Sequence, residues 1–348
     1  MKRILNLLLS SMMILGITSI STEACTRAVY TTKSGNVIVG RTMDWMAQEY
    51  PFIRKNPRGI KYKSTNFKNG LSWTSKYGSV AISGSFKGVN SGVNEKGLEV
   101  DCLWLDISDY GKLSANEKAI SIVDFTQYLL DNFATVDEVV KFIKTTNPRI
   151  TLGKDANILG VELKLHFVVT DKTGNNVLIE YLDGKVNLHN YKGRFVVTND
   201  PEYNRMTAIR DYYEQLGIGR NMPGSSLSEA RFVYTTGWLN QYTENILPGY
   251  IEGIPNKNFD EQAVMSVLSL MRGVSTPLGV EIEGDPNNTS TLWRTVTDLK
   301  NNKFYFDSAL TMATFWVDYT KLDYSSKKKE LPLTGKTFLG DITELLND

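Results

Sequence analysis

Cys25, one of two cysteines in the chain, directly follows a segment with the features of an export leader. Lys2 and Arg3 precede a mostly apolar run at residues 4–20, and small residues follow it. A basic, an apolar and a small-residue region in this order are typical of a secretory signal peptide. Cleavage after Ala24 would make Cys25 the first residue of the mature chain, with a thiol and an α-amine on one residue.

A cysteine at the first position can act as a nucleophile without help from a histidine. An α-amine has a pKa of about 7.7–8.0, against about 10.4 for lysine, so a substantial fraction of it is neutral at pH 7. The amine can therefore accept the proton of the neighbouring thiol, and the thiolate can attack a carbonyl carbon. The residues also permit a lipid-modified cysteine or an inert or disulfide-bonded thiol. Glu23 fits a lipoprotein cleavage site poorly.

The overall composition argues against several other functions. The chain has 39 basic and 38 acidic side chains; removing residues 1–24 takes away two basic and one acidic group and leaves 37 of each. A balanced charge does not favour nucleic acid or an anionic membrane as the main partner. His166 and His189 are scattered, and with the two cysteines they match no zinc-binding spacing. We therefore expect no metal and no cofactor.

The elements that must position Cys25 form blocks of strands and helices. Strand patterns precede two helical patterns, return after Gly160, and come back a third time near the C-terminus. Residues 25–348 contain no linker or repeat, so we expect one α+β domain behind a signal peptide at 1–24. The expected helices are 121–132, 136–146, 203–215 and 260–271, and the clearest turn is the hairpin signal Asp183-Gly184.

Ordered motifs along nearly the whole mature chain resemble the choloylglycine hydrolase family. This family of linear amide C–N hydrolases includes bile salt hydrolases and penicillin V acylases. The resemblance lies in the following stretches: VIVGRTMDW (37–45), VNEKGLEVDCLWL (93–105), LHFVVTDKTGN (165–175), VLIEYLDGK (177–185), VVTNDPEY (196–203), EARFVY (229–234), MRGVSTPLG (271–279) and STLWRTVTDLKNNKFYF (290–306).

The resemblance implies an Ntn-hydrolase fold, an αββα sandwich of two antiparallel sheets between helical layers, and a catalytic role for each of five residues. Cys25 Sγ attacks the amide carbonyl, and Asp44 holds the α-amine that takes and returns the proton. Arg41 stabilises the thiolate. The Asn199 side chain donates to the tetrahedral oxyanion, and Arg231 maintains the charge and hydrogen-bond network of the site.

Trp104 is a departure from the family pattern, since Gram-positive bile salt hydrolases have asparagine at this position and several penicillin acylases have tyrosine. Its backbone N–H can still bind the oxyanion, while its side chain reshapes the acyl pocket. Strand alternation places Val100, Cys102 and Trp104 on one face, so we expect Cys102 beneath the site as a buried, inert thiol. A Cys25–Cys102 disulfide is not expected, because it would consume the nucleophile.

The preferred substrate by resemblance is a glycine- or taurine-conjugated bile acid, because Trp104 and the leader look like the Gram-negative branch. Penicillin V and N-acyl homoserine lactones are the alternative amides, and a ligand-binding lipoprotein is the non-enzymatic alternative. The resemblance further implies a homotetramer, and the leader predicts a periplasmic or secreted protein. Apolar residues that could shape the acyl pocket, but that favour core packing individually, are Phe52, Ile53, Ile60, Trp73 and Tyr77.

Overall fold

The computed structural model describes eleven stretches of the chain: residues 25–64, 69–84, 88–114, 116–152, 157–158, 161–218, 221–242, 252–254, 257, 259–280 and 289–347. The predicted signal peptide, at residues 1–24, lies outside these stretches. Within them, no helix is long and apolar enough to cross a membrane.

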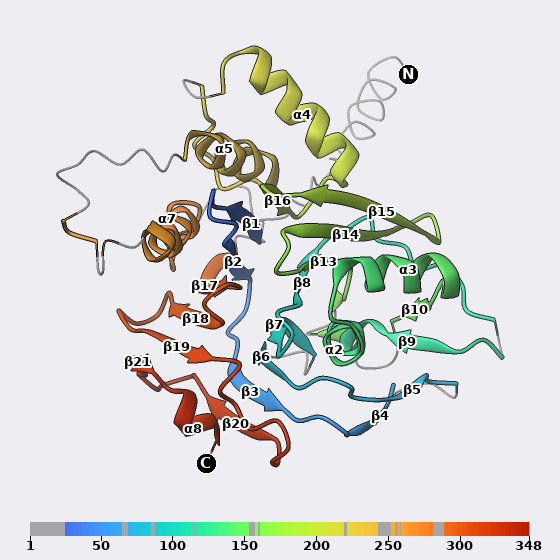
Figure 1. The fold of residues 1–348 in the computed structure, drawn as a ribbon. Helices are drawn as coiled ribbons and strands as arrows, with labels where there is room; N and C mark the ends of the chain where they lie inside the picture. Colours follow the sequence, from blue (N-terminus) through green and yellow to red (C-terminus); the bar gives the residue numbers. More distant parts are fainter. Residues whose placement is uncertain are drawn as a thin grey trace, which may run out of the picture.

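Two large sheets lie face to face (Figure 1). In spatial order, the strands of the seven-stranded sheet are β16 (Phe195–Thr198), β1 (Thr26–Thr31), β2 (Val37–Trp45), β17 (Ser290–Asp298), β18 (Lys303–Ser308), β19 (Thr314–Asp318) and β21 (Gly340–Asp341). Those of the eight-stranded sheet are β15 (Lys185–Lys192), β14 (Asn175–Leu182), β13 (Leu165–Thr170), β8 (Glu99–Trp104), β7 (Val89–Asn94), β6 (Ser79–Ser83), β3 (Phe52–Asn56) and β20 (Lys329–Pro332).

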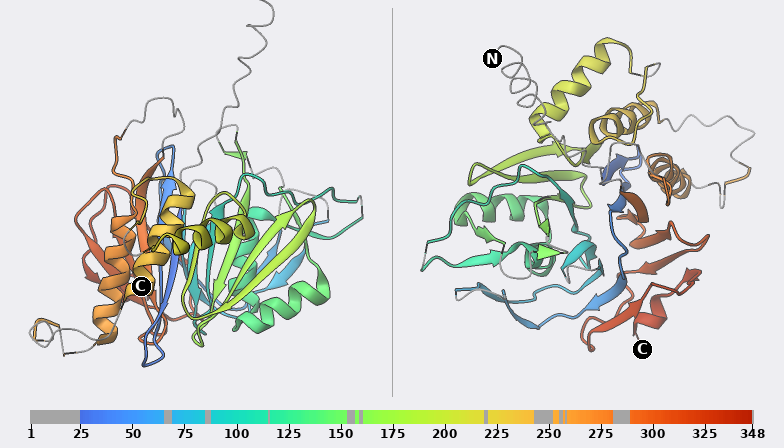
Figure 2. Two further views of the ribbon diagram at one scale, coloured as in Figure 1. Left: turned by 90° about the horizontal axis from the view of Figure 1, so that it is seen from above. Right: turned by 180° about the vertical axis from the view of Figure 1, so that it is seen from behind.

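Helices cover the outer face of each sheet, as both views in Figure 2 show. On the eight-stranded sheet, α2 (Ile122–Asn132) packs on β7 and β8, and α3 (Val136–Thr146) packs on β14. On the seven-stranded sheet, α5 (Ser228–Gln241) packs on β16 and β1, and α7 (Phe259–Gly273) packs on β2 and β17. This arrangement confirms the predicted αββα sandwich.

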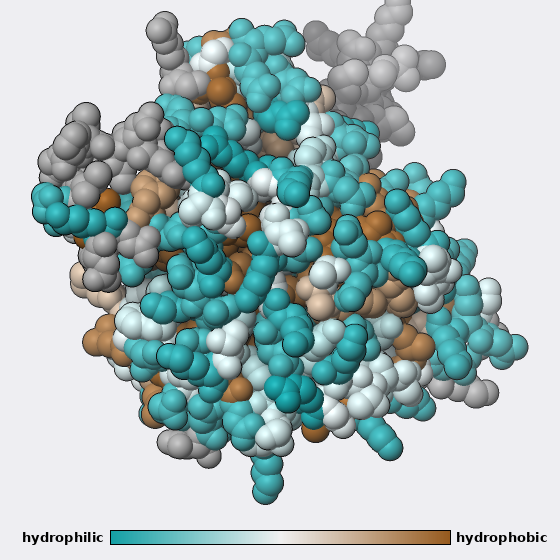
Figure 3. Space-filling model, in the orientation of Figure 1, coloured by the Kyte–Doolittle hydropathy of each residue, from teal (hydrophilic) through white to brown (hydrophobic). Residues whose placement is uncertain are grey.

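The remaining elements are short or peripheral. Helix α4 (Tyr203–Gln215) packs against α5, and α8 (Thr343–Asn347) contacts β19 and β20 near the C-terminus. Three small two-stranded sheets are formed by β4 (Lys61–Lys63) with β5 (Ser72–Thr74), β9 (Ala119–Ser121) with β10 (Arg149–Thr151), and β11 (Asn157–Ile158) with β12 (Val161–Glu162). The face shown in Figure 3 is largely hydrophilic, with apolar residues in small separate areas.

Local sequence signals account well for the elements. Thr135 caps α3 by accepting from the Glu138 amide at 3.2 Å, the contact that the local sequence Thr135-x-x-Glu138 favours at a helix start. Asp183 and Gly184 both have positive φ and join β14 to β15 in a tight hairpin. The four predicted helices are present within two residues at each end. Helix α5 was not predicted as an element, because its apolar residues do not gather on one face.

Gly40 allows α7 to approach β2 closely. A Cβ atom at this position would lie 2.5 Å from Cγ1 of Val267 and 2.9 Å from Cγ of Met271, both on α7. Since Gly40 faces the helices, its neighbour Arg41 faces the opposite sheet. The close packing of α7 therefore fixes the strand that carries Arg41 and Asp44.

Candidate active site

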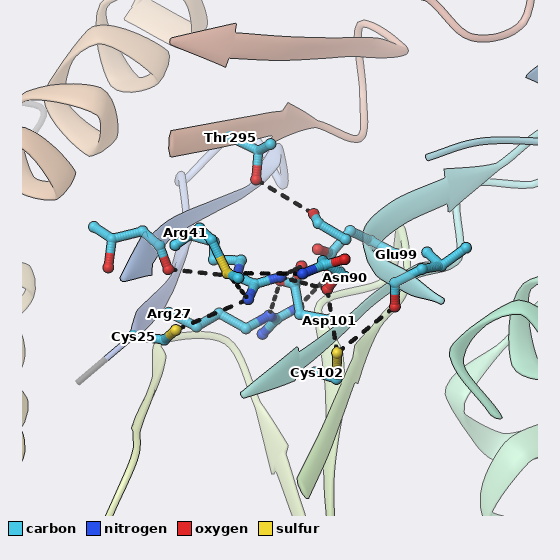
Figure 4. Close-up of polar contacts among 12 residues, drawn as sticks. Cys25, Arg27, Arg41, Asn90, Glu99, Asp101, Cys102 and Thr295 are labelled. Atoms are coloured by element: carbon cyan, nitrogen blue, oxygen red, sulfur yellow. Dashed lines mark hydrogen bonds and ion pairs between the residues drawn. The ribbon is translucent and has the colours of Figure 1, made fainter. Parts of the chain in front are cut away.

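Cys25 is held at the start of β1 by contacts with β2. Its Sγ lies 3.8 Å from the backbone oxygen of Asp44 and 4.0 Å from Nη2 of Arg41. The next residue, Thr26, donates its amide to Oγ1 of Thr42 at 2.9 Å. The thiol is 5% exposed, at the inner end of a small cavity. Figure 4 shows the sulfur directed toward the guanidinium of Arg41.

The electrostatics of Cys25 depend mainly on burial and on Arg41. Burial raises the pKa of the Cys25 thiol, and the positive charge of Arg41 opposes that rise. Burial alone would lower the pKa of Arg41, but the Asp101 carboxylate and the neighbouring thiols raise it overall. Arg41 therefore remains charged beside the sulfur, as its predicted role requires.

Asp44 is fixed by residues that are remote in the sequence. Arg231, on α5, donates from Nη1 to Asp44 Oδ2, and Thr291, on β17, donates to Oδ1 at 2.7 Å. Nη2 of Arg231 also donates to Oγ1 of Thr276. The structure thus brings Arg231 to the site by pairing it with Asp44, while the role of the two threonines was not predicted.

Asn199 lies beside Cys25 because of the register between β1 and β16. Thr26 pairs with Thr198, so the same antiparallel register places Asn199 opposite Cys25. The next residue, Asp200, accepts the Asp106 amide at 2.9 and 3.0 Å through its two carboxylate oxygens. That contact joins the segment that carries Asn199 to the segment that follows Trp104.

Two tryptophans border the cavity above Cys25. The rings of Trp45, at the end of β2, and Trp104, at the end of β8, are 6.1 Å apart between centroids and tilted by 54°. Both line the cavity of about 30 Å³ that contains Cys25, and Trp45 and Glu49 also line a neighbouring groove of about 420 Å³. Trp45 was not assigned a role from the sequence, although it directly follows Asp44 in the matched motif.

The predicted pocket residues do not surround Cys25. None of the five is among the residues that line its cavity in the described part of the chain. Ile53 packs in the core between the sheets, Ile60 is 40% exposed, and Trp73 stacks on Tyr62. Ile53 therefore has the core-packing role that the sequence favours for each of the five individually. A part for these residues in the acyl pocket stays a prediction, and β3 is separated from β8 by β6 and β7 in the eight-stranded sheet.

Cys102 is buried and free, as is Cys25. Its side chain packs with Val100 in the cluster between the eight-stranded sheet and α2, whereas Leu103 faces the seven-stranded sheet together with Cys25. Burial raises the pKa of the Cys102 thiol to about 12, which agrees with the predicted inert thiol. It also lines the Cys25 cavity from across β8.

A buried charged cluster that was not predicted from the sequence joins the two sheets beneath Arg41. Arg27 on β1 contacts Glu99 and Asp101 on β8, and Arg41 contacts Asp101 at 3.6 Å. The signal was present in the strand EVDCLW, where acids alternate with apolar residues in a segment expected to be buried. Among the described residues, no group of three or more histidine, cysteine, aspartate or glutamate side chains could hold a metal ion.

The two antiparallel sheets between helical layers define an αββα fold of the Ntn-hydrolase type, with Cys25 at the head of a strand beside a buried arginine. The model of the family "Linear amide C-N hydrolases, choloylglycine hydrolase family" matches residues 25–329. The chain belongs to this family and is a hydrolase of linear amide C–N bonds.

Named relatives lie on both branches of the family. A penicillin V acylase of Pectobacterium atrosepticum is 34% identical over 87% of this chain and 83% of its own length. A bile salt hydrolase/transferase of Clostridium perfringens is 29% identical over 54% of this chain and 57% of its own. The solved penicillin V acylase of Agrobacterium tumefaciens superposes with a TM-score of 0.80 at 34% identity, covering 93% of this chain and 97% of that one.

Proposed function

We propose that this chain is exported, loses residues 1–24, and hydrolyses N-acyl amides with Cys25 as its N-terminal nucleophile. The observation that carries the proposal is the position of Cys25: the family match begins there, and its sulfur lies 4.0 Å from the charged Arg41. In the full chain the Cys25 nitrogen is a peptide nitrogen, which is not basic. Cleavage after Ala24 would turn it into an amine that can accept the thiol proton.

The proposed reaction proceeds through a thioester. The α-amine accepts the thiol proton, and Sγ bonds to the amide carbonyl carbon. The Asn199 side-chain amide and the Trp104 backbone N–H then donate to the oxygen that gains negative charge. The C–N bond breaks, the leaving nitrogen takes the proton from the α-ammonium, and water hydrolyses the thioester by the same steps. Asp44, fixed by Arg231 and Thr291, orients the amine.

We favour a flat aromatic acyl group, such as the phenoxyacetyl group of penicillin V. Support comes from the tilted Trp45–Trp104 pair that lines the cavity, where an aromatic ring can pack against two indoles. The 34% identity with a penicillin V acylase over most of the chain points the same way.

Conjugated bile acids, the substrates preferred from the sequence, are the second candidate. They are supported by the bile salt hydrolase/transferase relative and by the groove of about 420 Å³ beside the cavity, whose lining includes Leu278, Leu292 and Phe306. A steroid could lie in this apolar groove with its amide directed toward Cys25.

The test is product analysis with penicillin V, glycocholate, taurocholate and an N-acyl homoserine lactone, on chains that begin at Cys25 and on chains that retain residues 1–24. We expect penicillin V to have the highest kcat/KM with the trimmed chain, and no turnover with the untrimmed chain. Intact mass of the exported protein would show an unmodified Cys25 at the N-terminus. Full activity of the untrimmed chain, or acylation of Cys25 in the active form, would contradict the proposal.

A further inference from the structure

Two arginines of the buried cluster beneath Arg41 lie directly opposite each other on neighbouring strands. Arg27 on β1 pairs with Arg41 on β2 in the antiparallel register, so both side chains leave the same face of the sheet. Both residues are 1% exposed. Like charges that lie directly opposite each other destabilise a sheet unless an anion lies between them.

Two acids on the facing strand supply the anionic charge. Glu99 and Asp101 alternate onto the inner face of β8, and each is at most 1% exposed. Nη2 of Arg27 donates to Glu99 Oε2, and Nε of Arg27 donates to Asp101 Oδ2 at 2.7 Å. Figure 4 shows the four side chains meeting between the two sheets. Arg27 also donates to Oγ1 of Thr170 at 2.8 Å.

Arg27 has closer contacts with the two acids than Arg41 has. Arg27 contacts both acids directly, whereas Arg41 Nη1 is 3.6 Å from Asp101. The other acceptors of Arg41 are neutral: the backbone oxygens of Asn90 and Thr42 and the sulfur of Met43. The charge of Arg41 is therefore the less neutralised of the two, and its Nη2 faces the Cys25 sulfur at 4.0 Å.

The two acids are held close together, because both contact the guanidinium of Arg27. Two carboxylates that share one buried site repel each other, which favours a proton on one of them. Burial raises the pKa of Glu99 well above its usual range, and Asp101 adds to that rise. Burial would also raise the pKa of Asp101, but Arg27 and Arg41 lower it.

We propose that Glu99 and Asp101 share one proton, so that the four-residue cluster keeps one net positive charge and holds it on Arg41 beside the nucleophile. Asp101 is the positioning residue, because it anchors Arg41 from below. Neutral Glu99 accepts a hydrogen bond from Arg27 and adds no negative charge that would offset the charge of Arg41. The remaining positive charge compensates the thiolate of Cys25, and so this inference rests on the nucleophilic role proposed for Cys25.

The other groups packed around the cluster leave this charge count unchanged. Asn90 and Ser91 on β7, Thr170 on β13 and Thr295 on β17 are neutral. The remaining ionisable groups near the sulfur are the Asp44 carboxylate, which is paired with Arg231, and the Cys102 thiol, whose pKa of about 12 keeps it protonated. The buried Glu49 carboxylate lines the same cavity and accepts from Nε1 of Trp293 at 2.8 Å. Trimmed chains add the α-amine of Cys25, and all of these groups are the same in the unmodified chain and in the variants compared below.

The first experiment measures the pH midpoint of Cys25 alkylation by iodoacetamide in trimmed chains, with peptide mass mapping to separate Cys25 from Cys102. Glu99→Gln keeps the size of the side chain and an oxygen that can accept from Arg27, and its amide can donate to a nearby carboxylate. We expect the same midpoint as in the unmodified chain. If Glu99 were ionised in the unmodified chain, the substitution would remove a negative charge near the sulfur. The midpoint of Cys25 alkylation would then fall by about one pH unit or more, and that result would overturn the proposal.

Asp101→Asn tests the anchor. We expect the midpoint to rise by about one unit, because Arg41 loses its only charged partner among the described residues and leaves the sulfur. With substrate, kcat should fall about tenfold or more while KM changes less than about twofold. An unchanged or lowered midpoint in folded protein would contradict the role of Asp101. If this variant does not fold, Glu99→Gln still decides the charge count, because it preserves the size of the side chain and an oxygen that can accept from Arg27.

Glu180→Gln is the matched control for removal of a buried carboxylate. Glu180 lies on β14 of the same sheet and contacts His166, His189 and the Tyr203 amide. Burial would raise its pKa, but the two histidines lower it to about 2, so this substitution removes a real charge. We expect reduced thermal stability and no shift of the alkylation midpoint. Alkylation requires no substrate, so a chain that hydrolyses none of the tested amides would refute the proposed function while still reporting on this cluster.

Discussion

The two cysteines of the chain lie in different sheets, Cys25 directly before β1 and Cys102 within β8. Both are buried and free, and burial raises the pKa of both thiols. They differ in their surroundings. Cys25 faces Arg41 at the inner end of a cavity, whereas Cys102 packs among apolar side chains beneath α2 and contacts the backbone oxygens of Val89 and Asn90.

Under the proposed function, the surroundings of the two thiols and not their burial distinguish the nucleophile from the inert cysteine. A thiolate in a buried site needs a nearby positive charge and space for a substrate. Both conditions are met at Cys25, because β1 and β2 bring Arg41 to the sulfur and two tryptophans border the space above it. Cys102 lies within the electrostatic range of the same arginine, and burial nonetheless raises the pKa of its thiol to about 12.

The largest expected effect separates the two thiols directly. Cys25→Ala should reduce hydrolysis by at least about 10⁴-fold while the fold is retained, because the nucleophile is lost. Cys102→Ala should keep kcat/KM within about threefold and lose about 1 kcal/mol of stability, since it removes only a small buried group. Steady-state kinetics and urea unfolding would measure both. Retained activity in Cys25→Ala, or its loss in folded Cys102→Ala, would reverse the assignment.

A second substitution, with a smaller expected effect, should make the Cys25 thiol less reactive and so more like the Cys102 thiol. Arg41→Lys keeps a positive charge but loses the planar guanidinium that reaches Asp101, Asn90 and Cys25 together. We expect kcat to fall about tenfold and the alkylation midpoint of Cys25 to rise. Thermal unfolding provides the control for structural damage. Unchanged kinetics would mean that charge alone, without the geometry of Arg41, activates the sulfur.

The smallest effect concerns the pH dependence of the free energy of unfolding. It must be separated from the pH dependence of hydrolysis. Burial raises the pKa of Asp131, at the end of α2, to about 7, although Trp73 and Gln127 donate to it. The folded state therefore holds a proton that the unfolded state releases near pH 4, so stability should fall as pH rises from about 4 to 7, by up to about 4 kcal/mol.

Asp131→Asn cannot ionise and should remove this slope. One of the two donors would lose its acceptor, so the variant should also be about 1 kcal/mol less stable near pH 4. Urea unfolding at several pH values would measure both effects. The pH dependence of hydrolysis should stay the same, since Asp131 does not line the Cys25 cavity. Parallel stability curves for the two chains would show that Asp131 does not titrate in this range.

Signals within a few residues of each other were enough to predict most of the elements. The Asp183-Gly184 turn, the Thr135 cap and the helical spacing at 122–132 act locally, and the structure contains each of them. The motif at 37–45 carried Arg41 and Asp44, and the resemblance added Asn199 and Arg231. Trp45 was within the same motif, but nothing local distinguishes an indole above a cavity from one in a core.

Sequence alone determined that Cys25 follows a leader-like segment and that strands and helices alternate in blocks, because such patterns depend on neighbouring residues. Tertiary structure decided which distant groups meet. Arg231 reaches Asp44 across 187 positions, and Arg27 reaches Asp101 across 74. These pairs exist because a charge buried in the packed interior must find a partner in space, and the packing of strands and helices determines which partner it meets.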